Sequence, residues 1–130
     1  MLTEAQGRFL QEPNYAVVAA LRPDGTPHQS VIWIDWDGRH VLVNLNTTRK
    51  KLEYLRDDPR TSVLVLDRES AYRWVGIDGV VDEITTDGAN EHIDHQARVY
   101  RGRESYGLGP GEQRVLVKVR PTRVTAYGVD

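Results

Sequence analysis

The chain of 130 residues contains no cysteine, which excludes disulfide bonds, thiolate metal sites and a cysteine nucleophile. It also lacks a strong charge of either sign. Its formal net charge is only -2, so it has no overall positive field to attract nucleic acid or an anionic membrane. No basic leader opens the sequence, and no apolar run approaches the length that a bilayer requires. These absences predict a cytoplasmic protein without a nucleic-acid or membrane partner.

The residues that are present suffice for one hydrophobic core. Hydrophobic residues make up 39% of the chain and charged residues 28%, a balance that is typical of a globular domain. A domain of this length buries about two-thirds of its unfolded surface. The sequence shows no internal repeat, linker or low-complexity segment, so we expect residues 1–130 to form a single domain.

Apolar runs separated by turn residues dominate the chain and predict a mainly β fold. Gly76 and Gly79 lie inside one run, where glycine marks a bulge or a close approach of another backbone. Pro121 separates the last two runs. The predicted strands cover residues 15–21, 28–35, 40–45, 61–66, 72–84, 114–119 and 123–129.

Short helices are expected between these strands. A capping box at Thr3 predicts a first helix that ends before Pro13. Leu52 and Leu55 predict the buried side of a second helix, and a third covers residues 87–101. The resulting fold class is an antiparallel sheet of six to seven strands, closed or half closed, with short α-helices.

Three strands, at residues 15–21, 28–35 and 72–84, are apolar at successive positions. Both of their faces therefore need cover, and a few short helices on a small chain do not readily provide it. We expect a second copy of the chain to provide the missing cover, because twofold homodimers are common. The alternative is a closed barrel whose strands keep an outer face.

Three cations stand where the second helix begins, in the stretch NLNTTRKK. The N-terminus of a helix is already positive, so each cation there costs about 0.3 to 1 kcal/mol unless an anion answers it. Free backbone N–H groups and the hydroxyls of Thr47 and Thr48 suit phosphate oxygens, and Arg56 extends the basic strip. The alternative is a solvated basic surface with an ion pair between Arg49 and Glu53.

Two other patterns predict no site. His92 and His95 lie three apart on the third helix, but no convincing further ligand accompanies them, so we expect exposed histidines and no metal. The glycines of residues 107–111 precede a strand rather than a helix, which excludes a dinucleotide-binding turn and leaves a loop.

The order of these segments resembles a known family. A hairpin at LRPDGTPHQSVIW is followed by VNLNTTRKK, a helix that ends in LRDDPR, and the strands TSVLVLD and YRWVGIDGVV. This order resembles the pyridoxamine 5'-phosphate oxidase-like split β-barrels, and more narrowly their actinobacterial branch of oxidoreductases that use the deazaflavin coenzyme F420. The resemblance implies the FMN-binding type of split barrel and a homodimer with the cofactor site at the subunit interface.

The resemblance also implies which residues hold the cofactor. One strand lies beside the ring, a basic turn holds the ribityl hydroxyls and the phosphate, and the partner subunit closes the site. No catalytic residue is assigned, because the cofactor carries the chemistry. The implied cofactor-binding residues are Gln29, Ser30, Val31, Trp33, Asn44, Asn46, Thr47, Arg49, Lys50, Lys51, Arg56, Tyr72, Arg73 and Trp74.

The implied activity is hydride transfer from reduced F420 to an electron-poor double bond of a small substrate such as an enone, a lactone or a tetrapyrrole-like molecule. An FMN-dependent enzyme on the same barrel is one alternative. A protein that only binds or stores a flavin or deazaflavin is the other. The chain ends in VTAYGVD without the arginine-containing substrate motif of the true oxidases, which argues against pyridoxal chemistry.

Overall fold

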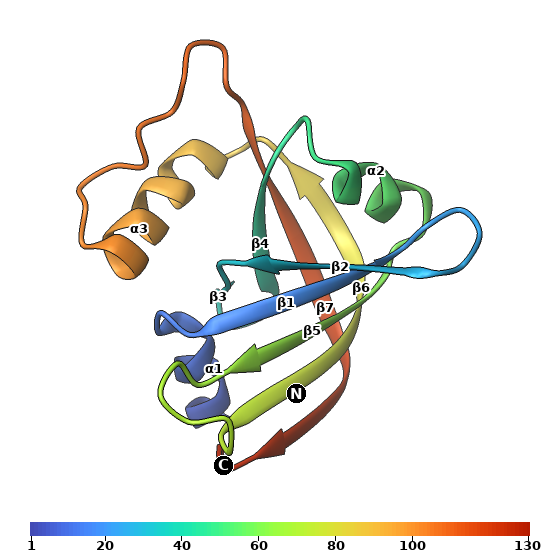
Figure 1. Cartoon of the computed structure of the whole chain (residues 1–130), viewed down its shortest axis with the longest axis vertical. Coiled ribbons are helices and arrows are strands. Elements are labelled where there is room, and N and C mark those ends of the chain that lie inside the picture. Colours follow the sequence, from blue (N-terminus) through green and yellow to red (C-terminus); the bar gives the residue numbers. More distant parts are fainter.

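Seven antiparallel strands form one sheet that curls into a half-barrel, with three short helices around it (Figure 1). The computed structural model describes residues 1–130. The predicted mainly β, antiparallel split barrel is confirmed. Its elements are α1 Glu4–Gln11, β1 Tyr15–Leu21, β2 Pro27–Ile32, β3 Asp35–Trp36, β4 Val41–Asn46, α2 Lys50–Asp57, β5 Arg60–Leu66, β6 Trp74–Thr85, α3 Ala89–Arg101 and β7 Arg114–Tyr127.

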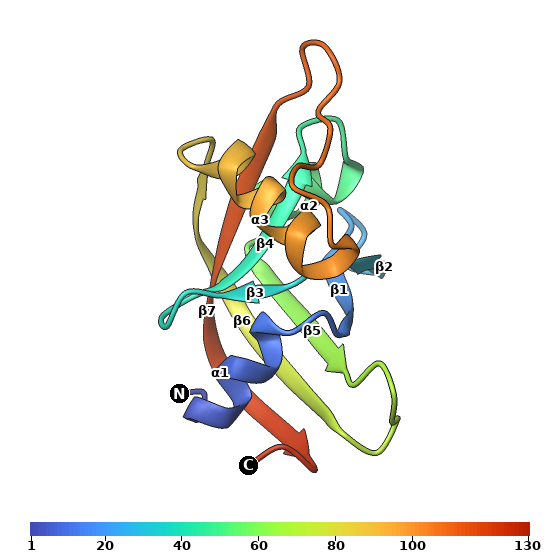
Figure 2. The same ribbon diagram turned by 90° about the vertical axis from the view of Figure 1, so that its left-hand side faces the viewer.

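The strand order β2-β1-β5-β6-β7-β4-β3 places β2 and β3 at the two edges of the sheet. The central strands β6 and β7 are the longest, with 12 and 14 residues, and two register shifts between them bend the sheet. Helices α2 and α3 lie toward one end of the sheet, whereas α1 and both termini lie toward the other (Figures 1 and 2). The two ends therefore offer separate surfaces.

Alternating side chains of the strands fill the core. In β5, Thr61, Val63 and Val65 are buried and the residues between them are exposed, the period of two that a sheet covered on one face shows. The inward side chains join Phe9 and Leu10 of α1 in a core of 20 buried residues. The apolar runs of the sequence thus continue onto a face that this chain does not cover.

The helices begin and end close to the predicted residues. In α1, the Thr3 hydroxyl accepts a hydrogen bond from the Gln6 backbone N–H at 3.1 Å, and the Gln6 side chain accepts one from the Thr3 N–H at 3.0 Å. Leu52 and Leu55 of α2 are buried as predicted. Helix α3 ends at Gly102, which has a φ of 66° that favours glycine. None of the three helices has the length and apolar content that crossing a membrane requires.

Residues 114–127 form one strand, where two had been predicted on either side of Pro121. Pro121 pairs with Gly79 at a register shift, and an irregular position tolerates a residue without an N–H group. A Cβ atom on Gly79 would lie 2.8 Å from the Arg120 carbonyl oxygen, so the close approach predicted there is confirmed. The same prediction is wrong for Gly76, which lies in regular register with ordinary clearance.

The predicted strand at residues 28–35 is interrupted. Strand β2 ends at Ile32, and β3 begins at Asp35. The Tyr100 hydroxyl takes the place of a strand partner in the gap, because it accepts a hydrogen bond from the Ile34 N–H and donates one to the Asn14 carbonyl, both at 3.0 Å. Burial raises the pKa of Tyr100 to about 12, so the hydroxyl keeps its proton for this contact.

Candidate functional site

A cavity of about 330 Å³ lies at the open seam of the half-barrel, where the edge strand β2 faces β4. The start of α2, one side of α3 and the 102–113 loop complete its wall. Its lining combines polar, cationic and aromatic side chains. The residues are Ser30, Val31, Ile32, Trp33, Asn44, Leu45, Asn46, Arg49, Lys51, Ile93, Gln96, Arg101, Tyr106 and Arg114.

The cavity brings together half of the residues implied by the resemblance, from three separate segments: Ser30, Val31, Trp33, Asn44, Asn46, Arg49 and Lys51. Four others from the same segments do not line it. Gln29 is exposed on β2, Thr47 and Lys50 are exposed on either side of Arg49, and Arg56 is exposed in the last turn of α2.

Lys51 is a half-buried cation in the wall of the cavity. Its Nζ donates to the Ser30 hydroxyl at 2.7 Å, and neither Lys51 nor Arg49 forms an ion pair. Burial lowers the pKa of Lys51, and the positive charges of Arg49 and Arg114 lower it further. The site therefore holds positive charge that no group of the protein neutralises.

Lys50 behaves differently from its neighbour. It is exposed and pairs with Glu53 at 3.1 Å, and this contact raises the pKa of Lys50. The sequence had suggested Arg49 as the partner of Glu53, which is wrong. Arg49 occupies the N-cap position of α2 without a side-chain capping bond and turns to the cavity instead.

Arg114 is a buried cation that the sequence analysis missed. Its Nε donates to Asn44 Oδ1 at 2.9 Å, and its Nη1 donates to Glu112 Oε2 at 3.1 Å. Hydrogen bonding from the Gly109 N–H lowers the pKa of Glu112, and Arg114 lowers it further. Arg114 is thus neutralised and held in one place, so it serves as a fixed donor in the wall rather than as a free charge.

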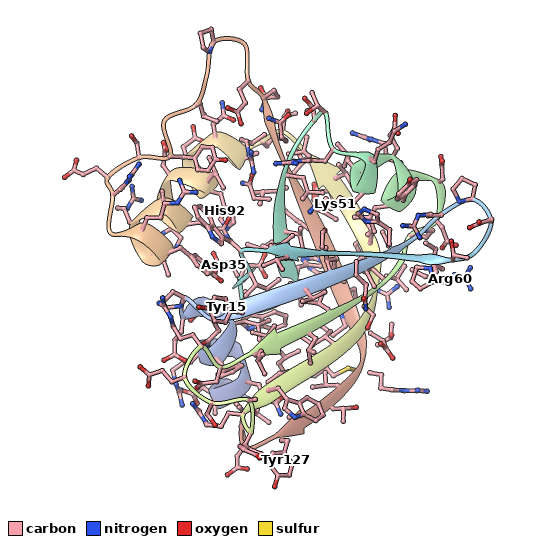
Figure 3. The ribbon with its side chains drawn as sticks, in the orientation of Figure 1. Tyr15, Asp35, Lys51, Arg60, His92 and Tyr127 are labelled. Atoms are coloured by element: carbon pink, nitrogen blue, oxygen red, sulfur yellow. The ribbon has the colours of Figure 1, made fainter.

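Asn44 continues this network to α3. Its Nδ2 donates to the Ala89 carbonyl at 2.8 Å and to His92 Nδ1 at 3.1 Å, while His92 Nε2 lies 2.9 Å from Asp35 Oδ2. Figure 3 shows His92 and Asp35 together on one side of β4 and Lys51 on the other. The prediction of a solvated His92 is wrong, because its side chain is 11% exposed; His95 is exposed as expected.

An aromatic cluster forms another wall of the cavity. Trp33 stacks on Tyr100 with ring centroids 5.0 Å apart, and the ring of Tyr106 meets Trp33 edge-on at 5.9 Å. The guanidinium of Arg101 lies 4.8 Å from the Trp33 ring centroid. This arrangement offers flat apolar surface beside the cations.

Gln96 of α3 also lines the cavity. It is 2% exposed, and neither its amide nitrogen nor its amide oxygen has a hydrogen-bond partner in the protein. No local sequence signal marks Gln96, Arg101, Tyr106 or Arg114, because each becomes part of the site only when α3 and the loop fold over β4. The sequence places the loop but does not show what it contacts.

Three residues implied by the resemblance, Tyr72, Arg73 and Trp74, lie at the other end of the sheet. Arg73 pairs with Asp67 and donates to the Gly128 carbonyl at 3.2 Å, and Trp74 stacks on Tyr127. They do not contact the cavity of their own chain. That they close the cavity of a second copy stays a prediction.

A larger hollow of about 600 Å³ lies between α1 and the turn after β3. Its lining carries charges of both signs, and two of these, Arg8 and Glu4, already form an ion pair. It contains no orphaned polar group and none of the residues implied by the resemblance. The smaller cavity is therefore the candidate site.

Comparison with known proteins gives the same split-barrel fold. No curated protein matches the sequence. A solved F420 reductase is 28% identical, with a TM-score of 0.82 over 95% of this chain and 98% of that one. A conserved hypothetical protein from Mycobacterium tuberculosis is 24% identical, with a TM-score of 0.73 over 98% and 85%. The heme storage protein HutZ from Vibrio cholerae is 13% identical, with a TM-score of 0.68 over 94% and 92%.

The family comparison covers almost every residue. The family described as pyridoxamine 5'-phosphate oxidase matches residues 2–128, a range that includes the whole sheet and all three helices. The chain therefore belongs to the pyridoxamine 5'-phosphate oxidase family.

Proposed function

We propose that the protein is an oxidoreductase that uses coenzyme F420 to reduce an electron-poor double bond of a small conjugated molecule. The observation that carries the proposal is the positive charge of Arg49 and Lys51, which faces the cavity without a counter-ion beside the Trp33 wall. The similarity to a solved F420 reductase supports the choice of coenzyme.

The residues of the cavity fit such a coenzyme. Lys51, Arg49 and the Ser30 hydroxyl supply donors for an acidic phosphate-bearing tail, and charge-assisted hydrogen bonds of this kind are the strong ones. The aromatic cluster around Trp33 supplies a flat wall for a ring. Cations and flat surface occur in the same cavity, which a ligand with both features requires.

The reduced deazaflavin, when bound, supplies a hydride. The protein then has to orient ring and substrate and exclude water, and it needs no nucleophile for that. Arg114 is suited to a positioning role, because Asn44 and Glu112 hold its guanidinium in place. The 102–113 loop brings Tyr106 against Trp33 and Arg114, where its ring forms part of the cavity wall.

An FMN-dependent enzyme is the second candidate, and membership of the family favours it. The two coenzymes differ in their acidic parts, since FMN carries one phosphate whereas F420 carries a phosphodiester and a polyglutamate tail. The unpaired Arg49, Lys51 and Arg101 at the cavity exceed what one phosphate needs. This excess of cations favours the longer ligand.

Calorimetric titration of the wild type with F420 and with FMN, side by side, tests the choice of coenzyme. We expect tighter binding of F420. Reduction of a simple enone by F420H2 in the presence of the protein then separates an enzyme from a storage protein. Tighter binding of FMN would transfer the proposal to the second candidate, and failure to bind either coenzyme would refute both.

The neighbouring lysines provide a matched pair of variants. Lys51→Gln should weaken F420 binding at least tenfold, about 1.4 kcal/mol, because its Nζ faces the cavity. Lys50→Gln should change the affinity less than twofold, because Lys50 is exposed and already paired with Glu53. Equal effects of the two changes would show that only the general charge of the surface matters.

A further inference from the structure

The buried amide of Gln96 is not explained by the binding of an acidic tail. With 2% exposure and no partner for either polar atom, it has lost its hydrogen bonds to water and has gained none from the protein. A buried polar group in this condition lowers stability. The cavity that it lines is the place where a partner for it could bind.

Gln6 shows how the same fold treats a buried glutamine with a purely structural role. It is 8% exposed, its Oε1 accepts from the Thr3 N–H at 3.0 Å, and its Nε2 donates to the Val129 carbonyl at 3.4 Å. Both ends of that amide are used within the chain. Gln96 is equally buried but is left without any such contact, and the difference indicates a ligand.

We propose that Gln96 binds the pyrimidinedione edge of the coenzyme ring, where an imide N–H lies between two carbonyl groups. This inference rests on the proposed function. A primary amide presents one donor and one acceptor side by side, and together they match the adjacent C=O and N–H of a cyclic imide in two hydrogen bonds. Glutamine reads the donor–acceptor edge of adenine in DNA by the same pairing.

The neighbours of Gln96 in the cavity support a ring rather than a chain-like ligand. Ile93 precedes it by one turn on α3 and is 2% exposed, and Trp33 belongs to the stacked aromatic cluster. Apolar surface next to a single amide is typical of a site for a flat heterocycle with one polar edge. The cations at Arg49 and Lys51 remain available for the acidic tail of the same ligand.

This hydrogen bonding would make Gln96 select ligands that carry an adjacent C=O and N–H on one edge of the ring. FMN and F420 share the pyrimidinedione, so Gln96 does not distinguish them, whereas a macrocyclic tetrapyrrole such as heme has no imide or lactam and lacks this edge. A site built to hydrogen-bond a ligand rejects analogues that leave its buried polar groups unpaired. Methylation of the imide nitrogen should therefore be enough to cause rejection.

Binding titrations with F420, and with its derivative methylated at the imide nitrogen, test the pairing. We expect the wild type to bind F420 at least tenfold more tightly than the methylated derivative. Gln96→Leu should bind F420 at least tenfold less tightly than the wild type and should not discriminate between the two ligands. Gln11→Leu, the same change on α1 outside the cavity, should behave as the wild type does.

Thermal unfolding without ligand gives a second readout that does not depend on activity. Gln96→Leu should raise Tm by about 3 °C, because it removes an unsatisfied amide. Gln6→Leu should lower Tm, because it breaks a capping bond and a bond to Val129.

The outcomes separate the two proposals. A wild type that binds F420 but does not discriminate against the methylated derivative overturns the role of Gln96 and leaves the proposed function standing. The same holds if Gln96→Leu binds as tightly as the wild type. A wild type that binds neither F420 nor FMN overturns both proposals.

Discussion

Lys51 illustrates at the scale of one residue how a binding site is kept at the expense of stability. Its ammonium is half-buried, and its partner is a hydroxyl rather than a carboxylate. Burial disfavours the charged form, which is why the pKa of Lys51 lies below 10.5. An anion in the cavity would relieve this cost, and an apolar side chain would remove it.

We predict that Lys51→Met raises the stability of the ligand-free protein at neutral pH. The charge is partly solvated, so the gain should be small, about 0.5 kcal/mol or about 2 °C in Tm. The cost of burying the charge is fully present below the folded pKa of Lys51 and disappears as the pH rises toward 10.5, the unfolded value. Thermal melts of both proteins from pH 7 to pH 10.5 should therefore converge, whereas a lower Tm for the variant at pH 7 would contradict the prediction.

His92 is fixed in one tautomer by its neighbours. Arg114 is only a donor, so the Asn44 atom that it contacts must be the amide oxygen, and Asn44 Nδ2 must then donate to His92 Nδ1. The proton of the ring therefore sits on Nε2, which donates to Asp35. Each hydrogen bond in the series from Arg114 through Asn44 and His92 to Asp35 therefore has a defined donor and a defined acceptor.

We predict that His92→Leu destabilises the protein by about 2 to 3 kcal/mol, because Asn44 and Asp35 each lose a partner in a partly buried position. His92→Gln should restore most of this loss, since its amide has one acceptor and one donor for the same two neighbours. Urea unfolding of the three proteins measures the difference. Equal destabilisation by both variants would show that ring packing, rather than the hydrogen-bonded chain, is what matters.

At the scale of elements, the junction of β6 and β7 depends on one glycine. A Cβ atom on Gly79 would lie 2.5 Å from Val119 Cγ1 and 2.8 Å from the Arg120 carbonyl oxygen, a backbone atom that cannot move without shifting the strand. The register shift that accommodates Pro121 occurs at the same place. The bend in the sheet and the absence of a side chain are therefore linked.

We predict that Gly79→Ala lowers the free energy of unfolding by about 2 to 4 kcal/mol through this overlap. Gly76→Ala on the same strand is the control, because its nearest neighbours would lie at an ordinary 3.7 Å and its backbone is extended. That change should cost less than about 0.5 kcal/mol or even stabilise the strand. A similar loss in both variants, measured by chemical unfolding, would remove the special role of Gly79.

The elements also show what local sequence can predict. The capping box at Thr3 and the buried pair Leu52 and Leu55 act within a few residues of each other, so their patterns were sufficient. Pro121 misled the prediction because its tolerance depends on Gly79, which is 42 residues away and meets it only in the folded sheet.

The residues of the candidate site also differ in whether a local sequence pattern predicts them. The basic turn is contiguous in sequence, so its pattern predicts Arg49 and Lys51 as binding residues, and both line the cavity. Arg114 and Gln96 become site residues through contacts with β4 and with the cavity, which no local pattern records. His92 was taken as exposed because its neighbours on α3 are charged, whereas its partners Asp35 and Asn44 come from other strands.

At the scale of the whole molecule, one face of the sheet carries apolar side chains that nothing in the chain covers. Val31, Val17 and Leu64 lie abreast on β2, β1 and β5, and Val31 and Leu64 are 72% and 43% exposed. Tyr15 and Tyr127, 55% and 59% exposed, belong to the next row of the same face, in which Leu66 of β5 and Trp74 of β6 lie between them. A contiguous apolar face of this kind marks a contact with another protein.

This outer face adjoins the cavity, because Val31 belongs to both. A second copy of the chain seated here would therefore form part of the rim of the cavity. If a twofold axis passed through this face, it would place Trp74 of one subunit near Val31 of the other. Tyr72 and Arg73 of the first subunit would then complete the cavity of the second. The predicted homodimer and the predicted role of these three residues thus depend on the same contact.

We predict that the wild type is a dimer and that Leu64→Lys, which places a charge in the centre of this face, raises the dimer dissociation constant at least 100-fold. Glu91→Lys on the exposed side of α3 is the control and should leave the dimer intact. Sedimentation equilibrium measures the association, and F420 titration measures its consequence: the monomeric variant should bind more weakly although every residue lining its own cavity is unchanged. A wild type that sediments as a monomer would exclude the shared site, and a monomeric variant with undiminished affinity would show that one chain holds the coenzyme alone.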